Sequence, residues 1–181
     1  MEDSLIISKF LKPDTQEEAF SALVKKYQER IYWHVRRMVI SHEDADDVVQ
    51  NVFVKVWKNL ENFRSDSKLY TWMYRIATNE CITFLNKKKR QNNISLDDED
   101  SAYLKESLTS GSYFDGEKAH KKLQEAILTL PDKQRLVFNM KYFEDLKYTD
   151  MSEILGTSVG ALKASYHLAV KKIESFFESA D

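Results

Sequence analysis

The spacing of apolar residues predicts helices along most of this chain. From Phe20 onward, apolar side chains recur at steps of three and four residues, through Leu23 and Tyr27 to Ile31. This spacing is typical of an amphipathic helix that turns one face toward a core. The pattern continues to Val39, so the first helix of this block is expected to end near that residue.

A second helix is expected after a break at Ser41 and His42. The break is followed by the acids Glu43, Asp44, Asp46 and Asp47. Acids are favourable there because the amino-terminal end of a helix is the positive end of its dipole. The apolar side of this helix consists of Ala45, Val48, Val49, Val52, Val56, Trp57 and Leu60. The opposite side carries Asp47, Gln50, Asn51, Val54 and Lys58. One side is therefore expected to pack and the other to be available to a partner.

A third helix is expected from about Leu69 to Lys89. Its inner face is predicted to consist of Leu69, Trp72, Met73, Ile76, Ala77, Cys81 and Phe84. At 100° per residue, another set of side chains falls within about a 100° arc of the same helix. These are Arg75, Asn79, Ile82, Thr83, Asn86 and Arg90. This stripe is either a solvated face or, with the aromatic residues Phe63, Tyr70, Trp72 and Tyr74 nearby, a surface for unpaired bases.

The carboxy-terminal block contains the signature of a helix-turn-helix. Helices are expected up to Leu130 and from Pro131 to about Phe143, because a proline is tolerated where a helix begins. A short helix should end at Gly156, with Ser158 capping a last helix that reaches about Phe177. Two helices joined by a tight turn with glycine are typical of a motif whose second helix enters the major groove.

Composition excludes several classes of protein. Four glycines and two prolines among 181 residues leave too little turn chemistry for an all-β fold. The single Cys81 cannot form an internal disulfide, and no apolar run is long enough to span a bilayer. Because the start of the chain also lacks the order of a secretory signal, a cytoplasmic location is expected. The predicted fold class is all-α.

Charge is distributed unevenly, although the formal net charge is only -2. Residues 68–90 carry six basic side chains and one acid, whereas residues 91–117 carry seven acids and one lysine. The second of these segments has no sustained apolar period, so it is predicted to be a flexible acidic linker. It would join a three- to four-helix bundle in residues 1–90 to a helix-turn-helix domain in residues 118–181.

Read in order, these blocks resemble bacterial RNA polymerase sigma factors of the extracytoplasmic-function group in the sigma-70 family. Asp44 to Phe53, followed by Val56-Trp57, is similar to the region 2.2 motif, and Tyr70 to Asn79 is similar to the start of region 2.4. In the second block the similarity is to region 4. The residues that carry it are Leu130 to Arg135, Val137-Phe138, Tyr142-Phe143, Ile154 to Gly156 and Ser158 to Lys163. The resemblance leaves only the linker and the two termini uncovered.

The resemblance implies two partners, core RNA polymerase and promoter DNA. The region 2.2 helix would dock on the clamp of the β′ subunit, and region 4 would meet the β flap. The implied polymerase-binding residues are Asp47, Gln50, Asn51, Phe53 and Val54. A mixed acidic, amide and apolar face suits a protein partner better than phosphate, which the acids would repel.

The resemblance also implies two DNA-binding surfaces. The third helix and the loop before it would read the −10 element as the promoter melts, with a flipped base entering a pocket formed by residues 62–68. The implied −10 residues are Asn62, Phe63, Arg64, Lys68, Arg75, Asn79, Thr83, Asn86, Lys87, Lys88 and Arg90. The last helix would read the −35 element. The implied −35 residues are Arg135, Lys147, Ser158, Gly160, Ala161, Lys163, Ala164, His167 and Lys171.

Some positions depart from the pattern of the family. Asn51 stands where the family often has Glu, and Thr83 stands where many members have Asp. Ser165, Leu168 and Val170 occupy positions where many relatives carry arginines. The grip of the last helix on phosphate is therefore expected to be weak, and avidity supplied by the polymerase should compensate.

No motif in the chain indicates an enzyme, a cofactor, a metal site or a small-molecule substrate. The four histidines form no i, i+4 pair and have no cysteine neighbour, so they are expected to be surface or capping residues. Cys81 is expected to be a buried packing thiol. No phosphate-binding glycine loop or catalytic signature occurs.

Alternatives to the sigma-factor interpretation come from other classes of protein. A helix-turn-helix regulator with an amino-terminal sensing or dimerisation domain would explain the second block, and an all-helical adaptor would bind protein alone. The family also includes members held by an anti-sigma protein, often one bound to a membrane. The acidic linker would permit that regulation, or it would thread the polymerase near the RNA exit path. The sequence leaves both roles open.

Overall fold

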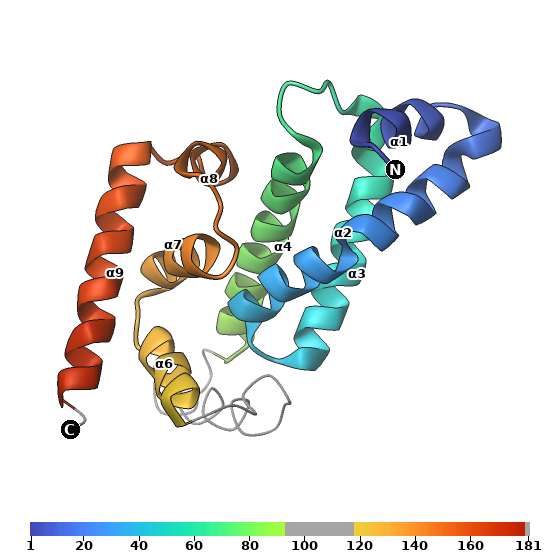
Figure 1. The fold of residues 1–181 in the computed structure, drawn as a ribbon. Coiled ribbons are helices and arrows are strands. Elements are labelled where there is room, and N and C mark those ends of the chain that lie inside the picture. Colours follow the sequence, from blue (N-terminus) through green and yellow to red (C-terminus); the bar gives the residue numbers. More distant parts are fainter. Residues whose placement is uncertain (93–117, 180–181) are drawn as a thin grey trace. The chain divides into compact units, whose positions relative to one another are not determined.

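The two halves of the chain form separate helical units. The computed structural model describes residues 1–92 and 118–179, and these residues contain α-helices and short 3₁₀ turns but no strand (Figure 1). The two compact units are Met1–Arg90 and Gln91–Asp181. The predicted all-helical class is confirmed for the described residues. Most of the predicted linker, residues 93–117, lies outside them.

The first unit contains four α-helices and two 3₁₀ turns. In chain order they are α1 (Asp3–Phe10), η1 (Pro13–Thr15), α2 (Gln16–Val39), α3 (His42–Asn59), η2 (Leu60–Asn62) and α4 (Leu69–Asn92). The end of α2 at Val39 and the break before α3 agree with the prediction from the sequence. Ser41 caps α3, because its hydroxyl accepts a hydrogen bond from the Asp44 amide at 3.4 Å.

The sequence pattern missed α1, which packs on α2. Ile6 and Phe10 are buried, and the Phe10 ring meets Trp57 edge to face at a centroid distance of 5.2 Å. Phe20 of α2 contacts the same indole at 4.9 Å. The assignment of Trp57 to the core side of α3 was wrong, because the residue is 36% exposed and lies in an aromatic cluster with α1 and α2.

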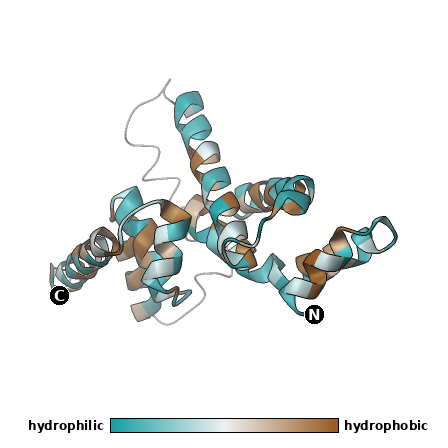
Figure 2. Ribbon diagram, turned by 90° about the horizontal axis from the view of Figure 1, so that it is seen from above, coloured by the Kyte–Doolittle hydropathy of each residue, from teal (hydrophilic) through white to brown (hydrophobic). Residues whose placement is uncertain are grey.

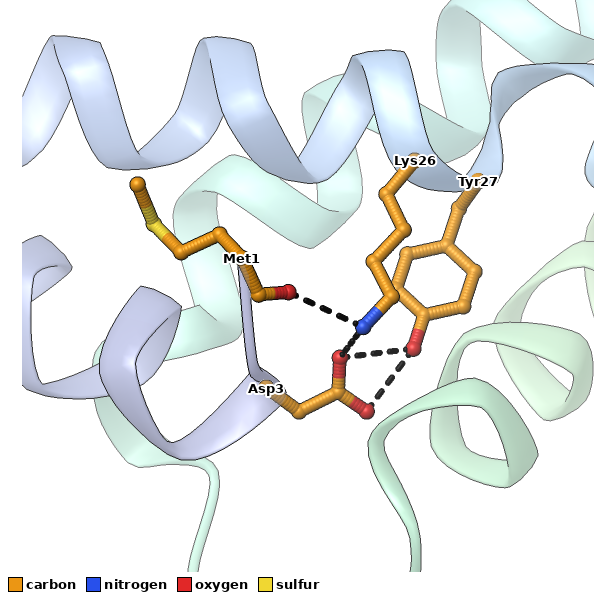
Figure 3. A network of polar contacts seen from close by, with 4 residues as sticks. All are labelled: Met1, Asp3, Lys26 and Tyr27. Atoms are coloured by element: carbon orange, nitrogen blue, oxygen red, sulfur yellow. Dashed lines mark hydrogen bonds and ion pairs between the residues drawn. The ribbon is translucent and has the colours of Figure 1, made fainter.

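Polar contacts attach the start of α1 to α2 (Figure 3). The Asp3 carboxylate accepts hydrogen bonds from the Lys26 ammonium at 2.6 Å and from the Tyr27 hydroxyl at 2.8 Å. The Lys26 ammonium also donates to the carbonyl of Met1 at 3.2 Å. Burial, and then the hydrogen bond to Asp3, raise the pKa of the Tyr27 phenol. The phenol therefore stays neutral and donates to the carboxylate.

The core of the first unit is built from α2, α3 and α4. Its buried apolar residues include Leu23, Ile31, Val35, Val48, Val52, Val56, Leu60, Met73, Ala77 and Cys81. The expected burial of Cys81 is confirmed, and burial raises the pKa of its thiol. His34 differs from the expectation of a surface histidine. It is buried, and its Nε2 lies 2.9 Å from the Thr78 hydroxyl of α4.

The second unit contains α6 (Lys118–Leu128), α7 (Asp132–Tyr142), α8 (Tyr148–Leu155) and α9 (Val159–Ser179). Hydrophobic and hydrophilic residues alternate along the helices, as Figure 2 shows by colour. The core cluster consists of Ala126, Ile127, Leu130, Phe138, Ala169 and Ile173. It joins α6, α7 and α9. In the described part of the chain, no helix is both long and apolar enough to cross a membrane.

The turn between α8 and α9 has the predicted caps. Gly156 ends α8 in the left-handed conformation, with φ of 63°, and its amide donates to the Ser152 carbonyl at 2.9 Å. The Ser158 hydroxyl accepts a hydrogen bond from the Ala161 amide at 3.2 Å.

Pro131 precedes α7 as its amino-terminal cap, one residue before the position where a proline usually begins a helix.

Candidate protein and nucleic-acid interfaces

The outer side of α3 forms the candidate protein interface. Asp47, Gln50 and Asn51 are exposed, Val54 is 46% exposed and Phe53 is half-buried. The opposite side of the helix is buried through Ala45, Val48, Val52 and Val56. The exposed side therefore presents one acid, two amides and apolar surface together. Such a mixture of groups suits contact with another protein.

The outer side of α4 carries the polar and basic stripe predicted from the sequence. Its exposed residues are Arg75, Asn79, Ile82, Thr83, Asn86, Lys87 and Arg90. The Thr83 hydroxyl donates a hydrogen bond to the Asn79 carbonyl at 2.8 Å, within the same helix. The amides of Asn79 and Asn86 lie two turns apart, with cationic side chains before and after them. The stripe therefore combines groups that bind phosphate with groups that bind base edges.

Ion pairs join α3 to α4. The Lys88 ammonium lies 2.6 Å from Oδ2 of Asp44, and Lys55 of α3 pairs with Glu80 of α4. The Lys88 and Asp44 side chains are only 30% and 22% exposed. Lys88 thus differs from the exposed Lys87, because the carboxylate of Asp44 in α3 already compensates the charge of Lys88. The pairs connect the helix that carries the candidate protein interface to the helix that carries the basic stripe.

The loop between η2 and α4 is partly packed on α4. Asn62, Arg64 and Lys68 are exposed, whereas Phe63 is half-buried with its ring centroid 5.2 Å from that of Trp72. The loop thus presents cations, the exposed acid Asp66 and the outer part of one aromatic ring, next to the amide of Asn62 at the end of η2. Tyr74 was among the aromatic residues expected to be available for stacking, and that expectation was wrong because it is completely buried.

The first half of α9 is the outer face of the helix-turn-helix. The exposed residues of α9 up to Lys171 are Gly160, Ala161, Lys163, Ala164, His167, Leu168 and Lys171, with Ser158 exposed just before the helix. Apart from the adjoining residues and backbone of its own helix, nothing lies within 4 Å of the position that a Cβ would take at Gly160. Small residues beside a lysine and a histidine leave the backbone of this face accessible to a large partner such as a DNA groove.

Two basic residues of the second unit differ in their surroundings. Lys147 is exposed at the start of α8. The Arg135 side chain is only 12% exposed and pairs with Asp132 at 3.2 Å, and burial lowers the pKa of its guanidinium.

A residue that sequence reasoning missed is Tyr148. Its ring lies 5.3 Å from the Lys141 ammonium and 5.8 Å from that of Lys163, and it therefore helps to place a lysine of α9.

The residues that the structure describes contain no group of three or more metal-binding side chains. Exposed polar, basic and small residues on α3, α4 and α9 make up the candidate surfaces. The expected roles of the individual residues on them stay predictions.

Comparison with known families covers both units. Residues 23–91 match the model for sigma-70 region 2, and residues 120–173 match a model for sigma-70 region 4. These matches include α3, α4 and the helix-turn-helix. A helix-turn-helix regulator with an unrelated amino-terminal domain would not account for the region 2 match.

Individual relatives agree with the family models. The chain is 32% identical to the ECF RNA polymerase sigma factor SigW of Bacillus subtilis over 160 residues, which is 83% of this chain and 84% of that protein. It is 29% identical to the ECF RNA polymerase sigma-E factor of Escherichia coli K12 over 180 residues, which is 96% of this chain and 93% of that protein.

Solved structures share the fold. CnrH in complex with the cytosolic domain of CnrY aligns with a TM-score of 0.71 and 19% identity, covering 99% of each chain. The sigma factor RpoE of Bartonella quintana, in complex with the anti-sigma factor NepR, aligns with a TM-score of 0.70 and 18% identity over 88% of this chain and 96% of that one. The chain therefore belongs to the extracytoplasmic-function sigma factors of the sigma-70 family, the non-enzymatic subunits with which RNA polymerase initiates transcription.

Proposed function

We propose that this sigma factor docks on core polymerase through α3, reads the −10 element with α4 and its preceding loop, and reads the −35 element with α9. The observation that carries the proposal is the different chemistry of two adjacent helices. The outer side of α3 presents an acid and two amides with apolar surface, whereas the outer side of α4 is basic, and ion pairs connect the helices. Neighbouring helices with different surface chemistry suit one protein partner and one nucleic-acid partner.

The polymerase contact is assigned to the β′ clamp. The exposed Asp47, Gln50 and Asn51 provide directional polar contacts, and Val54 with part of Phe53 provides apolar area. DNA would be repelled from this surface by Asp47 and by the exposed Asp46 next to it. Region 4 would meet the β flap, so that the polymerase holds both units on one promoter.

Promoter melting is assigned to α4 and the loop before it. Unstacking a base costs a few kcal/mol, so the protein must return stacking surface, hydrogen bonds and phosphate neutralisation. The exposed part of Phe63 offers stacking surface and Asn79 offers an amide. Lys87 and Arg90 offer positive charge. These groups support the entry of an unpaired base beside the loop.

Recognition of the −35 element is assigned to the outer face of α9. Lys163 and His167 would face base edges, and Lys147 and Lys171 would contact phosphate. We assign Arg135 a positioning function instead, because its side chain is largely buried beside Asp132. Because only Lys147, Lys163 and Lys171 are assigned to the DNA contact, this unit would bind DNA weakly alone and would depend on the polymerase for avidity.

Regulation by an anti-sigma protein is part of the proposal. The solved structures of CnrH with CnrY and of RpoE with NepR support it, because both share the fold of this chain. The protein would act in the cytoplasm, where bacterial polymerase works, and an anti-sigma protein bound to the membrane would hold it inactive until a signal arrives.

Binding to core polymerase in the absence of DNA tests the docking assignment. The purified chain is mixed with core enzyme, and complex formation is measured by gel filtration and by fluorescence anisotropy. Replacing Asp47 and Gln50 with Ala should weaken the complex about tenfold or more, since few residues dominate most interfaces. Glu29→Ala is the matched control, because Glu29 is an exposed acid of α2 away from this surface. Equal affinity of the double variant and the control would refute the assignment.

A further inference from the structure

An apolar side chain interrupts the polar face of α4. Ile82 is 42% exposed, and its neighbours on the helix surface are Asn79, three residues before it, and Asn86, four residues after it, while the exposed Thr83 follows it in the sequence. The Thr83 hydroxyl already donates to the Asn79 carbonyl, so Thr83 offers its methyl group and an acceptor oxygen to a partner. The side chain of Ile82 thus forms a small apolar area between two side-chain amides.

The surroundings of this area carry little uncompensated charge. Glu80, the acid of α4 next to it in the sequence, pairs with Lys55 of α3. Lys88 pairs with Asp44. Exposed cations stand before the area at Arg75 and after it at Lys87 and Arg90. Cations at both ends suit phosphates on either side of a groove, and the uncharged middle of the face then lies toward the bases.

The chemistry of the middle of the face is specific for one base pair. Thymine is the only base that presents a methyl group in the major groove, and apolar side chains contact it there. Asparagine pairs with the N6 and N7 atoms of adenine in the same groove. An apolar side chain flanked by two asparagines thus matches adjacent A·T pairs better than any other sequence.

We infer that Ile82 is a specificity-determining residue that contacts the C5-methyl group of a thymine in the duplex part of the −10 element. The inference rests on the proposed role of α4 in −10 binding, and it adds the base feature that this helix reads. Asn79 or Asn86 contacts the adenine of the same or the next pair. The assignment concerns one methyl group, so one chemical change in the DNA isolates it.

The experiment replaces each thymine of the −10 element, one at a time, with deoxyuridine, which lacks only that methyl group. Holoenzyme is assembled from core polymerase and this chain, on a promoter whose start site has been mapped. Affinity for each fragment is measured with the wild type, Ile82→Ala and Ile82→Val. One thymine position should show about a fourfold loss with the wild type, the effect expected for removing one methyl group from an apolar contact. Deoxyuridine at that position should have little effect on the affinity of the Ile82→Ala holoenzyme. The Ile82→Val holoenzyme should keep most of the sensitivity to deoxyuridine.

The control variant is Leu5→Ala, which removes an apolar side chain of similar exposure from α1 and should keep the full sensitivity to deoxyuridine. A similar loss with Ile82→Ala and with the wild type, or no sensitive thymine at all, would overturn the inference while the holoenzyme still initiates. Loss of core binding by Ile82→Ala would also overturn it, because Ile82 would then face protein. Failure of the wild-type holoenzyme to initiate on any promoter would instead refute the proposed function.

Discussion

The Lys88 ammonium of α4 lies 2.6 Å from the carboxylate of Asp44 in the first turn of α3. This contact joins the start of one helix to the end of another, 44 residues apart in the chain. It changes the expected role of Lys88, because a lysine that already has an acidic partner gains less from a phosphate than an exposed lysine does. Lys88 therefore contributes to the arrangement of α3 and α4 more than to the binding of DNA.

Variants of two adjacent lysines should separate these roles. Lys88→Ala removes the ion pair and should lower the free energy of unfolding by about 1 kcal/mol. Lys87→Ala should leave stability unchanged, weaken binding on all promoters and reduce the salt slope by about one. Thermal unfolding and salt titrations of holoenzyme binding measure the two effects. Equal stability of both variants, with the larger change of salt slope in Lys88→Ala, would contradict this assignment.

The amide of Asn79 should contribute to selectivity and little to general affinity. Asn79→Ala should reduce the preference for the correct −10 sequence by about 1–3 kcal/mol, the range for a lost bidentate base contact. Binding to fragments with an altered −10 element should change little. Competition between matched and altered promoters measures this difference. A uniform loss on all fragments would mean that Asn79 contacts the backbone or supports the fold.

The contact between Tyr27 and Asp3 should make stability depend on pH at the alkaline end. Burial and the hydrogen bond to Asp3 raise the pKa of the phenol in the folded state. Below about pH 10 the phenol is neutral in both states, so its contribution to stability is complete. Above that pH the unfolded chain releases the proton first, and the free energy of unfolding falls.

Tyr27→Phe should therefore cost about 1 kcal/mol at neutral pH, because the hydrogen bond is lost. It should also reduce the decline of stability above about pH 10. Urea unfolding of the wild type and the variant between neutral and alkaline pH measures both effects. A variant whose stability declines as steeply as that of the wild type would show that other groups cause the decline.

Arg135 and Lys147 should respond differently to replacement. Arg135→Ala removes a largely buried side chain and its contact with Asp132, and should destabilise the second unit by about 1–3 kcal/mol. Lys147→Ala should leave stability unchanged and weaken binding to the −35 element in a salt-dependent way. Unfolding curves and DNA titrations of the full chain measure these effects. If Arg135→Ala unfolds like the wild type but loses DNA affinity, Arg135 is a phosphate contact after all.

Local signals in the sequence predicted much of the fold. The end of α8 at Gly156 and the start of α9 after Ser158 follow from residues that act on their own turn, through a left-handed conformation or a cap. The exposed sides of α3 and α4 follow from the helical period alone. Such signals need no knowledge of the rest of the chain.

Contacts between distant elements were not predictable in this way. The position of Trp57 depends on α1, a short helix that lies before a proline and has Ile6 and Phe10, at a spacing of four, as its buried residues. The burial of His34 depends on its contact with Thr78, which lies 44 residues away. The pairing of Lys88 with Asp44 likewise requires that α3 and α4 meet. The run of basic residues from Lys87 to Arg90 therefore did not reveal that Lys88 is paired with an acid while Lys87 is exposed.

Run-off transcription shows whether this chain directs core polymerase to promoters. Purified bacterial core polymerase is incubated with a library of promoter fragments, with and without this chain, and the transcript ends are mapped. We predict discrete new start sites that depend on the chain and share sequence near −10 and −35. No initiation above that of core polymerase alone, together with no binding to core, would contradict this prediction.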